Sequence, residues 1–341
     1  MGKFFLGLSL SFIVLFIINI TFVILNLIFW VTNGLQALLL EMNFIERIYY
    51  STYMKWIILA DGLWFSILLI FMLKRKHYKT DVQLHYLNYE PINNPKISVI
   101  IPTFNEEENV ERVVRDYIQQ KNVENVIVVD NNSSDKTVYL AKKCGATVIT
   151  KDSNKGFAHS CVIGLHESLK TTANVIAFTE CDGTFSSYDL NKMIPYLDNS
   201  HLVIGTRQVQ VLTEKGNQNS MFYVWGNYIL AKLIQIKYFS LLHLGIVQLT
   251  DVGCMHRCIR RDSLEKIIDQ FTYPGTDEVK VTANSGLFAI FMTTIGIENN
   301  LKIVEVPITF KKRIGVSKTE SDKKLRAIKY GLTFFWYIIS H

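Results

Sequence analysis

Two long apolar stretches dominate the first part of the chain. Residues 4–30 contain no charged side chain, and residues 56–73 contain only Asp61. A transmembrane α-helix needs about 20 consecutive apolar residues, so both stretches predict helices that span a membrane. The first is too long for the apolar core of a signal peptide and lacks a small-residue cleavage site, which indicates an uncleaved anchor within residues 1–79.

The residues after the second stretch predict its orientation. Residues 74–79 form a basic cluster with three Lys and one Arg, and such clusters next to a membrane span stay on the cytoplasmic side. Two spans then place both the N-terminus and everything after residue 74 in the cytoplasm. The sequence therefore predicts an integral membrane protein with two spans and a large cytoplasmic domain.

Beyond a polar connector, residues 80–95, short β-branched runs alternate with helical stretches. The predicted strands are Lys96–Ile101, Asn125–Val129, Ala146–Ile149 and Asn174–Phe178, and the predicted helices are Glu107–Gln119, Ser134–Lys143 and Phe157–Leu169. Strands that are buried on both faces and separated by helices are typical of an α/β fold with a doubly wound, mostly parallel sheet. Such sheets bind ligands at the carboxyl ends of their strands.

Two later segments are rich in apolar and aromatic residues. Residues 220–249 predict a helix that either lies on the membrane surface or caps the core. Residues 311–329 carry eight Lys or Arg side chains, and residues 334–337 are aromatic. Residues 319–341 therefore predict a basic and aromatic C-terminal helix, for which an interfacial position and a solvated position against the domain are both open.

The composition excludes an ordinary soluble protein. Of the 341 residues, 49% are hydrophobic and 19% are charged, whereas soluble domains have about 25% charged residues. About 245 residues remain beyond the anchor, enough for one large domain with its own core. The net charge is +6, and the odd number of cysteines, five, fits reduced thiols. Cys254 and Cys258 lack a second ligand pair at zinc-finger spacing.

Acidic and amide side chains follow three of the predicted strands: Asn105, Glu106, Asp130, Asp135, Glu180 and Asp182. Two carboxylates at i and i+2 before a glycine turn suit a divalent cation, because Mg²⁺ takes one or two protein carboxylates and completes its shell with water and substrate phosphates. No Gly-x-Gly-x-x-Gly follows the first strand, and no Gly-x-x-x-x-Gly-Lys-Ser/Thr occurs anywhere. This weakens a dinucleotide dehydrogenase and a P-loop NTPase.

Seven motifs, in order, carry a resemblance to a known family: SVIIPTFNEEENV, VIVVDNNSSDKT, NKG, ECDGTF, VIGTR, DVGCMHRCIRR and EVPITFKKRIGVSK. The chain resembles family 2 glycosyltransferases with the GT-A fold and is most similar to the polyprenyl-phosphate (dolichol-phosphate) sugar synthases. The resemblance implies a catalytic domain over residues 96–318 that moves a sugar, with inversion, from a nucleoside-diphosphate sugar to a polyprenyl phosphate on the cytoplasmic face. It implies no nucleic-acid partner.

The resemblance also assigns residues to the donor and to a metal. The nucleotide-sugar residues would be Pro102, Asn105, Glu106, Asp130, Asp135, Lys155, Gly156 and Glu180. Asp182 and Glu180 occupy the Asp-x-Asp position of the family, which implies Mg²⁺ or Mn²⁺ as the cofactor. Glu180 departs from the first Asp by one methylene group, which leaves open whether it binds the metal directly.

The acceptor side is assigned in the same way. Arg207, Arg313 and Lys318 would bind the acceptor phosphate, and we prefer them to Arg257 and Arg260. The catalytic set is then Asp251, Asp182 and Arg207. A phosphate acceptor is nucleophilic near pH 7 without a base, so Asp251 would orient it. A hydroxyl acceptor would instead make Asp251 the general base.

Two alternatives follow from the same residues. One is a glycosyltransferase that acts on a hydroxyl of a lipid-linked saccharide or a glycolipid. The other is a catalytically degenerate membrane scaffold that binds a nucleotide sugar or lipid. The second is motivated by Glu180 and by the apolar segment Ser285–Phe291, where family members often carry Glu or Gln.

Overall fold

The computed structural model describes residues 17–18, 21, 24, 59, 61–63, 66, 88–214, 221–238, 248–281, 285–315 and 324–341. Contacts between residues divide the chain into two compact units. The smaller unit comprises Met1–His77, Phe239–Leu244 and Tyr337–His341, and the larger comprises Tyr78–Tyr238 and Gly245–Trp336. The larger unit contains the sheet and every candidate site residue that the structure describes.

The predicted membrane spans, residues 4–30 and 56–73, lie outside the described residues apart from isolated helical positions. Among the positions that are described, no helix combines the length and the apolar character needed to cross a bilayer. The two spans and their orientation therefore stay predictions.

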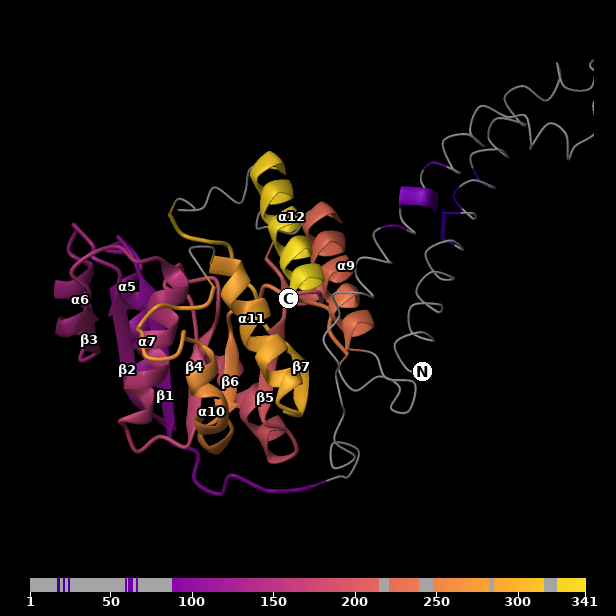
Figure 1. Cartoon of the computed structure of the whole chain (residues 1–341). Coiled ribbons are helices and arrows are strands. Elements are labelled where there is room, and N and C mark those ends of the chain that lie inside the picture. The colour runs from indigo at the N-terminus through magenta and orange to yellow at the C-terminus, as the bar shows by residue number, and fades with distance from the viewer. Residues whose placement is uncertain are drawn as a thin grey trace, which may run out of the picture. The chain divides into compact units, whose positions relative to one another are not determined.

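A seven-stranded sheet forms the centre of the larger unit, in the order β3-β2-β1-β4-β6-β5-β7 (Figure 1). Its strands are β1 (Ile97–Thr103), β2 (Val123–Asp130), β3 (Thr147–Thr150), β4 (Val175–Phe178), β5 (Leu202–Thr206), β6 (Arg257–Arg260) and β7 (Ile303–Pro307). Strands β1 to β4 are parallel to their neighbours among these four, and β5 is parallel to β7. Strand β6 is antiparallel to both β4 and β5. The prediction of an α/β fold with a mostly parallel sheet is confirmed.

Helices and short 3₁₀ turns connect the strands. The helices are α5 (Val110–Ile118), α6 (Thr137–Lys143), α7 (Phe157–Leu169), α8 (Leu190–Met193), α9 (Met221–Lys237), α10 (Arg261–Ile267), α11 (Ser285–Glu298) and α12 (Lys324–Ser340). The 3₁₀ turns are η2 (Ser187–Asp189), η3 (Ile194–Asp198), η4 (Gln210–Leu212) and η5 (Ile268–Gln270). Helices α7 and α11 contact each other and lie on the side of the sheet that faces the viewer in Figure 1.

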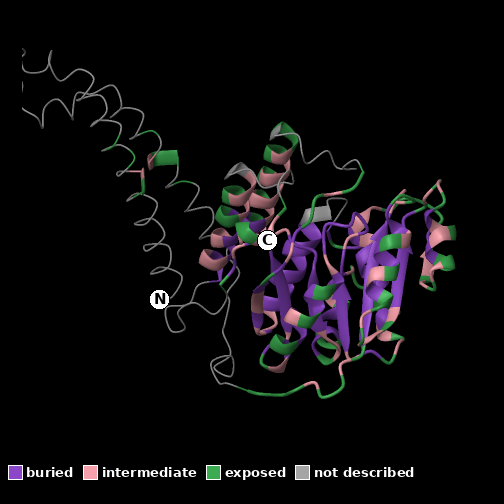
Figure 2. Cartoon of the chain, turned by 180° about the vertical axis from the view of Figure 1, so that it is seen from behind, coloured by how far each residue is buried: buried purple, intermediate pink, exposed green. Residues whose placement is uncertain are grey.

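The core follows from the β-branched runs that predicted the strands. Every residue of β1, β4 and β5 is buried, and Figure 2 shows the strands almost wholly in the buried colour. Helix α7 packs closely on this layer, because a Cβ added at Gly164 would lie 2.2 Å from Ile100 Cγ2. Helix α11 is apolar all round, as expected for a helix buried on every side, and its residues 287–297 are buried.

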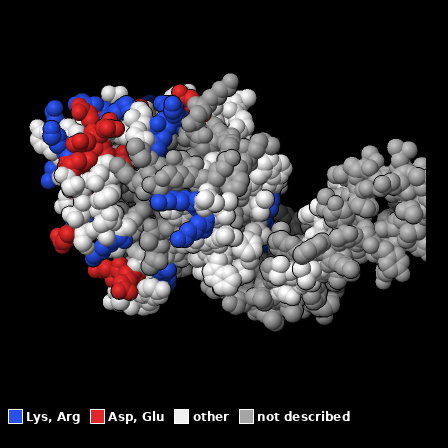
Figure 3. Space-filling model, turned by 90° about the horizontal axis from the view of Figure 1, so that it is seen from above, with Lys and Arg blue, Asp and Glu red and all other residues white. Residues whose placement is uncertain are grey.

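The strand directions bring one set of loops to one edge. The connector enters β1 from below in Figure 1, so the parallel strands β1 to β4 end at the upper edge. Strand β6 runs in the opposite direction, so the residues before it, 251–256, reach that same edge. Figure 3 looks down on this edge and shows both acidic and basic side chains there. This edge carries the candidate site.

Candidate active site

The loops after β1 and β2 are joined by side chain–backbone hydrogen bonds. The backbone N–H of Asn105 donates to Ser133 Oγ at 2.8 Å, and the Asn105 side chain accepts from the Ser134 N–H at 2.9 Å. The Glu106 N–H donates to Thr137 Oγ1 at 2.8 Å. Asn105 has φ 52°, a left-handed conformation that asparagine tolerates better than most residues. The structure therefore brings these two predicted donor loops together.

Asp135 fixes this joint. Its carboxylate accepts from the N–H of Glu107 at 3.1 Å, from the N–H of Thr137 at 2.9 Å and from the Thr137 hydroxyl at 2.5 Å. These bonds connect the loop after β1, at Glu107, with the first residue of α6, Thr137. This geometry is compatible with the predicted role, in which Asp135 orients the donor loop.

Asp130, at the end of β2, has one oxygen that the protein does not use. Its Oδ2 accepts from the Ser133 N–H at 3.0 Å. Its Oδ1 is buried and has no hydrogen-bond partner within the described ranges. A buried acceptor without a donor is costly, so this oxygen is suited to receive a hydroxyl or amine from a ligand. Pro102, in β1, pairs with Val129, the residue before Asp130 in β2.

The Lys155–Gly156 segment is held by two asparagines. Asn131 Oδ1 accepts from the Lys155 N–H at 3.1 Å, and Asn131 Nδ2 donates to Asn154 Oδ1 at 2.6 Å. Gly156 has φ 88° and precedes α7, which favours glycine there. The Lys155 side chain is exposed at this edge. Its predicted contact with a diphosphate stays a prediction.

Lys151 is a residue that the sequence analysis missed. It follows β3 directly, is 9% exposed, and donates from Nζ to the Gly156 carbonyl at 3.4 Å. Burial lowers the pKa of its amine to about 8. A Lys immediately after a predicted strand was the available signal, since strand ends carry the ligands of this fold class.

The turn of residues 180–183, called the acid turn below, follows β4. Gly183 has φ 74°, and Asp182 Oδ1 accepts from the N–H and the hydroxyl of Thr184 at 3.0 and 2.6 Å. Arg313 Nη2 lies 2.5 Å from Asp182 Oδ2 and 3.7 Å from Glu180 Oε2. The contact between Arg313 and Asp182 is an ion pair and not an aligned hydrogen bond. Asp182 Oδ2 has no hydrogen-bond partner within the described ranges. The acid turn thus presents two carboxylates and one facing cation.

The two carboxylates of the acid turn repel each other. Burial, followed by the charge of Asp182, raises the pKa of Glu180 to about 8, against the opposing charges of Arg313 and Arg207. A divalent cation beside both carboxylates would favour their ionised forms. The turn therefore fits a cation chemically. Across the described segments, no group of three or more His, Cys, Asp or Glu side chains could hold a metal, so the remaining ligands would be water and substrate, as Mg²⁺ prefers.

Arg207, after β5, forms a two-pronged ion pair with Asp251. Its Nε donates to Asp251 Oδ2 and its Nη2 to Oδ1, both at 2.7 Å, and its backbone N–H donates to Oδ2 at 3.1 Å. The Asp251 side chain is fully buried, whereas that of Arg207 is 17% exposed. Although burial alone would raise it, the pKa of Asp251 is lowered overall by Arg207. Whether Asp251 is catalytic stays a prediction, but in this arrangement its carboxylate is committed to Arg207.

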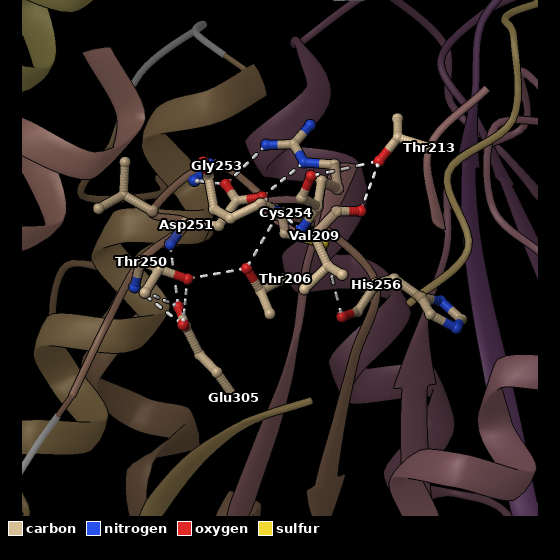
Figure 4. A network of polar contacts seen from close by, with 12 residues as sticks. Thr206, Val209, Thr213, Thr250, Asp251, Gly253, Cys254, His256 and Glu305 are labelled. Carbon is tan, nitrogen blue, oxygen red and sulfur yellow. Dashed lines mark hydrogen bonds and ion pairs between the residues drawn. The ribbon is translucent and has the colours of Figure 1, made fainter. Parts of the chain in front are cut away.

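Glu305, on β7, is a second residue that the sequence analysis missed. Its carboxylate accepts from the N–H groups of Thr250 and Asp251 and from the Thr250 hydroxyl, at 2.7 to 3.0 Å (Figure 4). The available signal was its position in the quoted motif EVPITF.

The remaining predicted cations lie elsewhere. Arg257 is fully buried and donates to the carbonyls of Cys254 and Val252 and to Thr293 Oγ1, so it serves the interior. Arg260 bonds the carbonyls of Glu90 and Leu197. The preference for Arg207 and Arg313 over these two is compatible with this geometry. Lys318 lies outside the described residues. The five cysteines are free thiols, and four of them are buried.

The sequence matches a family of glycosyltransferases. The family model Glycosyl transferase family 2 matches residues 98–268, about half of the chain, and the chain is a member of that family. The polyprenol monophosphomannose synthase of Mycolicibacterium smegmatis is 30% identical over 228 residues, which cover 64% of this chain and 79% of that protein.

Two further proteins are similar over less sequence or at lower identity. The 4,4'-diaponeurosporenoate glycosyltransferase of Staphylococcus aureus is 33% identical over 102 residues, which cover 28% of this chain and 26% of that protein. The crystal structure of glucosyl-3-phosphoglycerate synthase from Mycobacterium tuberculosis, in complex with Mn²⁺, UDP and phosphoglyceric acid, has a TM-score of 0.50 at 15% identity. That match covers 74% of this chain and 87% of that chain, and it shows the fold alone.

Proposed function

We propose that the protein transfers a sugar from a nucleoside-diphosphate sugar to a polyprenyl phosphate at the cytoplasmic face of a membrane. Family membership supports sugar transfer. The relative named polyprenol monophosphomannose synthase supports a polyprenyl-phosphate acceptor, since most of its length is matched. The ordered motifs quoted above point to the same class.

The commitment of Asp251 to Arg207 is the observation that carries the choice of acceptor. A hydroxyl acceptor needs a general base within reach of its proton. The residue that the sequence offers for this task holds Arg207 with both oxygens. A phosphomonoester has a second pKa of about 6 and is largely dianionic at pH 7, so it attacks without a base. The arrangement therefore favours a phosphate over a hydroxyl.

The donor would lie across the ends of β1, β2 and β4. The unpartnered Asp130 oxygen is placed to accept a hydroxyl or an amine of the nucleoside, and the exposed Lys155 is a cation for the diphosphate. A divalent cation held by Asp182 and Glu180 would neutralise charge on the leaving diphosphate when bound. Arg313, which contacts both carboxylates, would then be available to a phosphate.

Exposed apolar side chains support a position at the membrane. On α12 they recur every three or four residues, along one face: Leu325, Ile328, Leu332 and Trp336. On α9 the exposed ones are Trp225, Tyr228 and Ile229, and the two helices lie side by side in both views (Figures 1 and 2). Exposed apolar faces with basic neighbours are typical of helices at a lipid interface, and Arg326 and Lys329 are also exposed.

The test is a transfer assay with the full chain in membranes. The membranes are incubated with Mn²⁺, a polyprenyl monophosphate and a panel of UDP- and GDP-sugars, and glycosylated lipid is detected by mass spectrometry. We expect one donor to yield a lipid-phosphate sugar, and no product from Asp182→Ala. A product only with hydroxyl acceptors would replace the proposal by the glycolipid alternative. Nucleotide-sugar binding without any product would indicate a scaffold.

A further inference from the structure

The segment Thr250–Cys254 is held from two sides by charged side chains, the half-buried Glu305 and the buried Arg257. On one side, Glu305 accepts the N–H groups of Thr250 and Asp251. On the other, Arg257 donates to the carbonyls of Val252 and Cys254. Charged partners make strong hydrogen bonds to a backbone. The backbone of the segment is therefore held along its length, and this also fixes where the Asp251 carboxylate lies.

The contacts form a continuous chain from Glu305 to Arg207. Glu305 holds the backbone N–H of Asp251 at 3.0 Å. The Asp251 side chain then holds both the backbone and the guanidinium of Arg207. Figure 4 shows Glu305 below Thr250 and Asp251, aimed at their N–H groups. A displacement of Glu305 would thus reach Arg207 through a single intervening residue.

A second route joins the same groups through hydroxyls. Thr250 Oγ1 donates to Glu305 at 2.7 Å and lies 2.8 Å from Thr206 Oγ1. Thr206 in turn accepts from the Gln208 N–H at 3.3 Å. Because Thr206 and Gln208 flank Arg207 in the chain, both its backbone and its side chain are tied to Glu305.

The direction of the guanidinium is fixed by its two neighbours. Asp251 takes the Nε and one Nη2 hydrogen, and the Phe310 ring lies 5.2 Å from Arg207 Cζ, within cation–π range. Three of the five N–H groups of an arginine remain outside the Asp251 pair. The side chain is 17% exposed and directly follows β5, so part of it can be reached from the sheet edge, and Asp251 and Phe310 limit its direction.

We infer that Glu305 is a positioning residue for acceptor recognition: it holds the Thr250–Asp251 backbone so that Asp251 aims Arg207 at the acceptor phosphate. The inference rests on the proposed function, because it takes Arg207 as a phosphate-binding residue. It adds Glu305 to the site residues that the resemblance assigns.

The test is Glu305→Gln in the full chain, purified in detergent, with farnesyl phosphate as the acceptor probe. Glutamine offers one acceptor oxygen and one NH₂ group, so it cannot satisfy the three donors that Glu305 accepts. The loss of at least one bond lets Asp251 shift, and small misplacements at a site are costly. We expect the Kd for farnesyl phosphate and the acceptor KM to rise roughly tenfold, while the Kd for the donor nucleotide and kcat at saturating acceptor stay within about twofold.

The matched control is Glu298→Gln. Glu298 is a half-buried carboxylate on α11 that accepts from the Tyr238 hydroxyl at 3.0 Å, and it belongs to neither loop. We expect it to leave both Kd values unchanged.

Two results would overturn the inference. In one, Glu305→Gln binds farnesyl phosphate as the wild type does. In the other, it weakens nucleotide and farnesyl phosphate binding together, as general damage to the fold would. A failure of the proposed function would give a different result: the wild type would bind nucleotide but not farnesyl phosphate.

Discussion

The two ends of the sheet edge are built by different means. At the β1–β3 end, the loops are joined by hydrogen bonds from the backbone to side chains that lie 2 to 31 residues away, such as Asp135 with Thr137 and Asn105 with Ser133. At the β5–β7 end, the joining contacts span 44 to 55 residues and are made by buried or half-buried charged side chains, as between Arg207, Asp251 and Glu305. The first end depends on hydrogen bonds between side chains and the backbone, and the second on an ion pair and hydrogen bonds over longer separations in the chain.

This difference has a physical consequence. Hydrogen bonds of the kind found at the β1–β3 end contribute about 1 kcal/mol each and can be lost singly. Buried charged groups depend on one another, because the loss of one partner leaves the other uncompensated. We therefore expect substitutions at the β1–β3 end to have limited, donor-specific effects. Those at the β5–β7 end should act on the acceptor, and the acid turn between the two ends should affect both.

The acid turn should show the largest effect. We expect Asp182→Ala to lower kcat by at least about 100-fold, because it removes the carboxylate that would hold the cation and that now pairs with Arg313. Steady-state transfer assays at saturating donor and acceptor measure this. Asp277→Ala, an exposed acid outside the acid turn, is the control and should retain activity. Full activity of Asp182→Ala would contradict the assignment of the site.

The next prediction concerns how the stability of the fold depends on pH, through His256 at the centre of the sheet. His256, fully buried beside β6, donates from Nδ1–H to the Phe178 carbonyl at 3.0 Å and stacks on Phe185. Burial lowers its pKa to about 4 in the folded state, against 6.5 normally. The unfolded chain takes up the proton below pH 6.5 while the folded chain does not. The stability that the neutral His256 contributes is complete above pH 6.5 and is lost progressively as the pH falls toward 4.

Unfolding of the detergent-solubilised chain at several pH values tests this. His256→Phe keeps a ring against Phe185 but cannot titrate, so its stability should fall less steeply than that of the wild type between pH 6.5 and 4. Parallel loss in the two proteins would show that other groups cause the acid sensitivity.

Much of the β1–β3 end could be predicted from the sequence. The strands come from β-branched runs buried on both faces, and α7 has the predicted bounds Phe157–Leu169. Helices α5 and α6 begin three residues later than predicted, at Val110 and Thr137. The reason is that the residues before them form the joint between the loops, where side chains compete with helical hydrogen bonds for the backbone.

The β5–β7 end could be predicted only in part. Arg207 and Asp251 were each identified as site residues, but no local pattern shows that residues 44 positions apart share one ion pair. The same holds for Glu305, whose donors lie more than 50 residues away in the chain. The apolar segment Ser285–Phe291, which lacks the Glu or Gln that family members often carry, forms part of the buried helix α11. Long-range pairing and burial depend on the whole fold, and the pattern of apolar and polar residues along the chain does not predict them.

Asp251→Asn tests what the β5–β7 end does. Asparagine keeps the shape but loses the charge and one acceptor oxygen, so Arg207 loses its two-pronged partner. With a phosphate acceptor, we expect the acceptor KM to rise by about 10- to 100-fold, and kcat at saturation to fall much less. Transfer kinetics at varied acceptor concentration measure both. A near-complete loss of kcat would instead make Asp251 a general base and favour a hydroxyl acceptor.

Asp135→Asn tests the β1–β3 end and should have the smallest effect. The amide can replace one acceptor oxygen but not both, so the bond from the Glu107 N–H or that from the Thr137 N–H is lost. We expect a loss of about 1 kcal/mol in the free energy of unfolding and a rise of about threefold to fivefold in the donor nucleotide Kd, measured by calorimetry. Asp152→Asn, an exposed acid after β3, is the matched control. An equal change in acceptor binding would mean that the two ends of the edge are coupled, and a division into a donor end and an acceptor end would not describe how this site works.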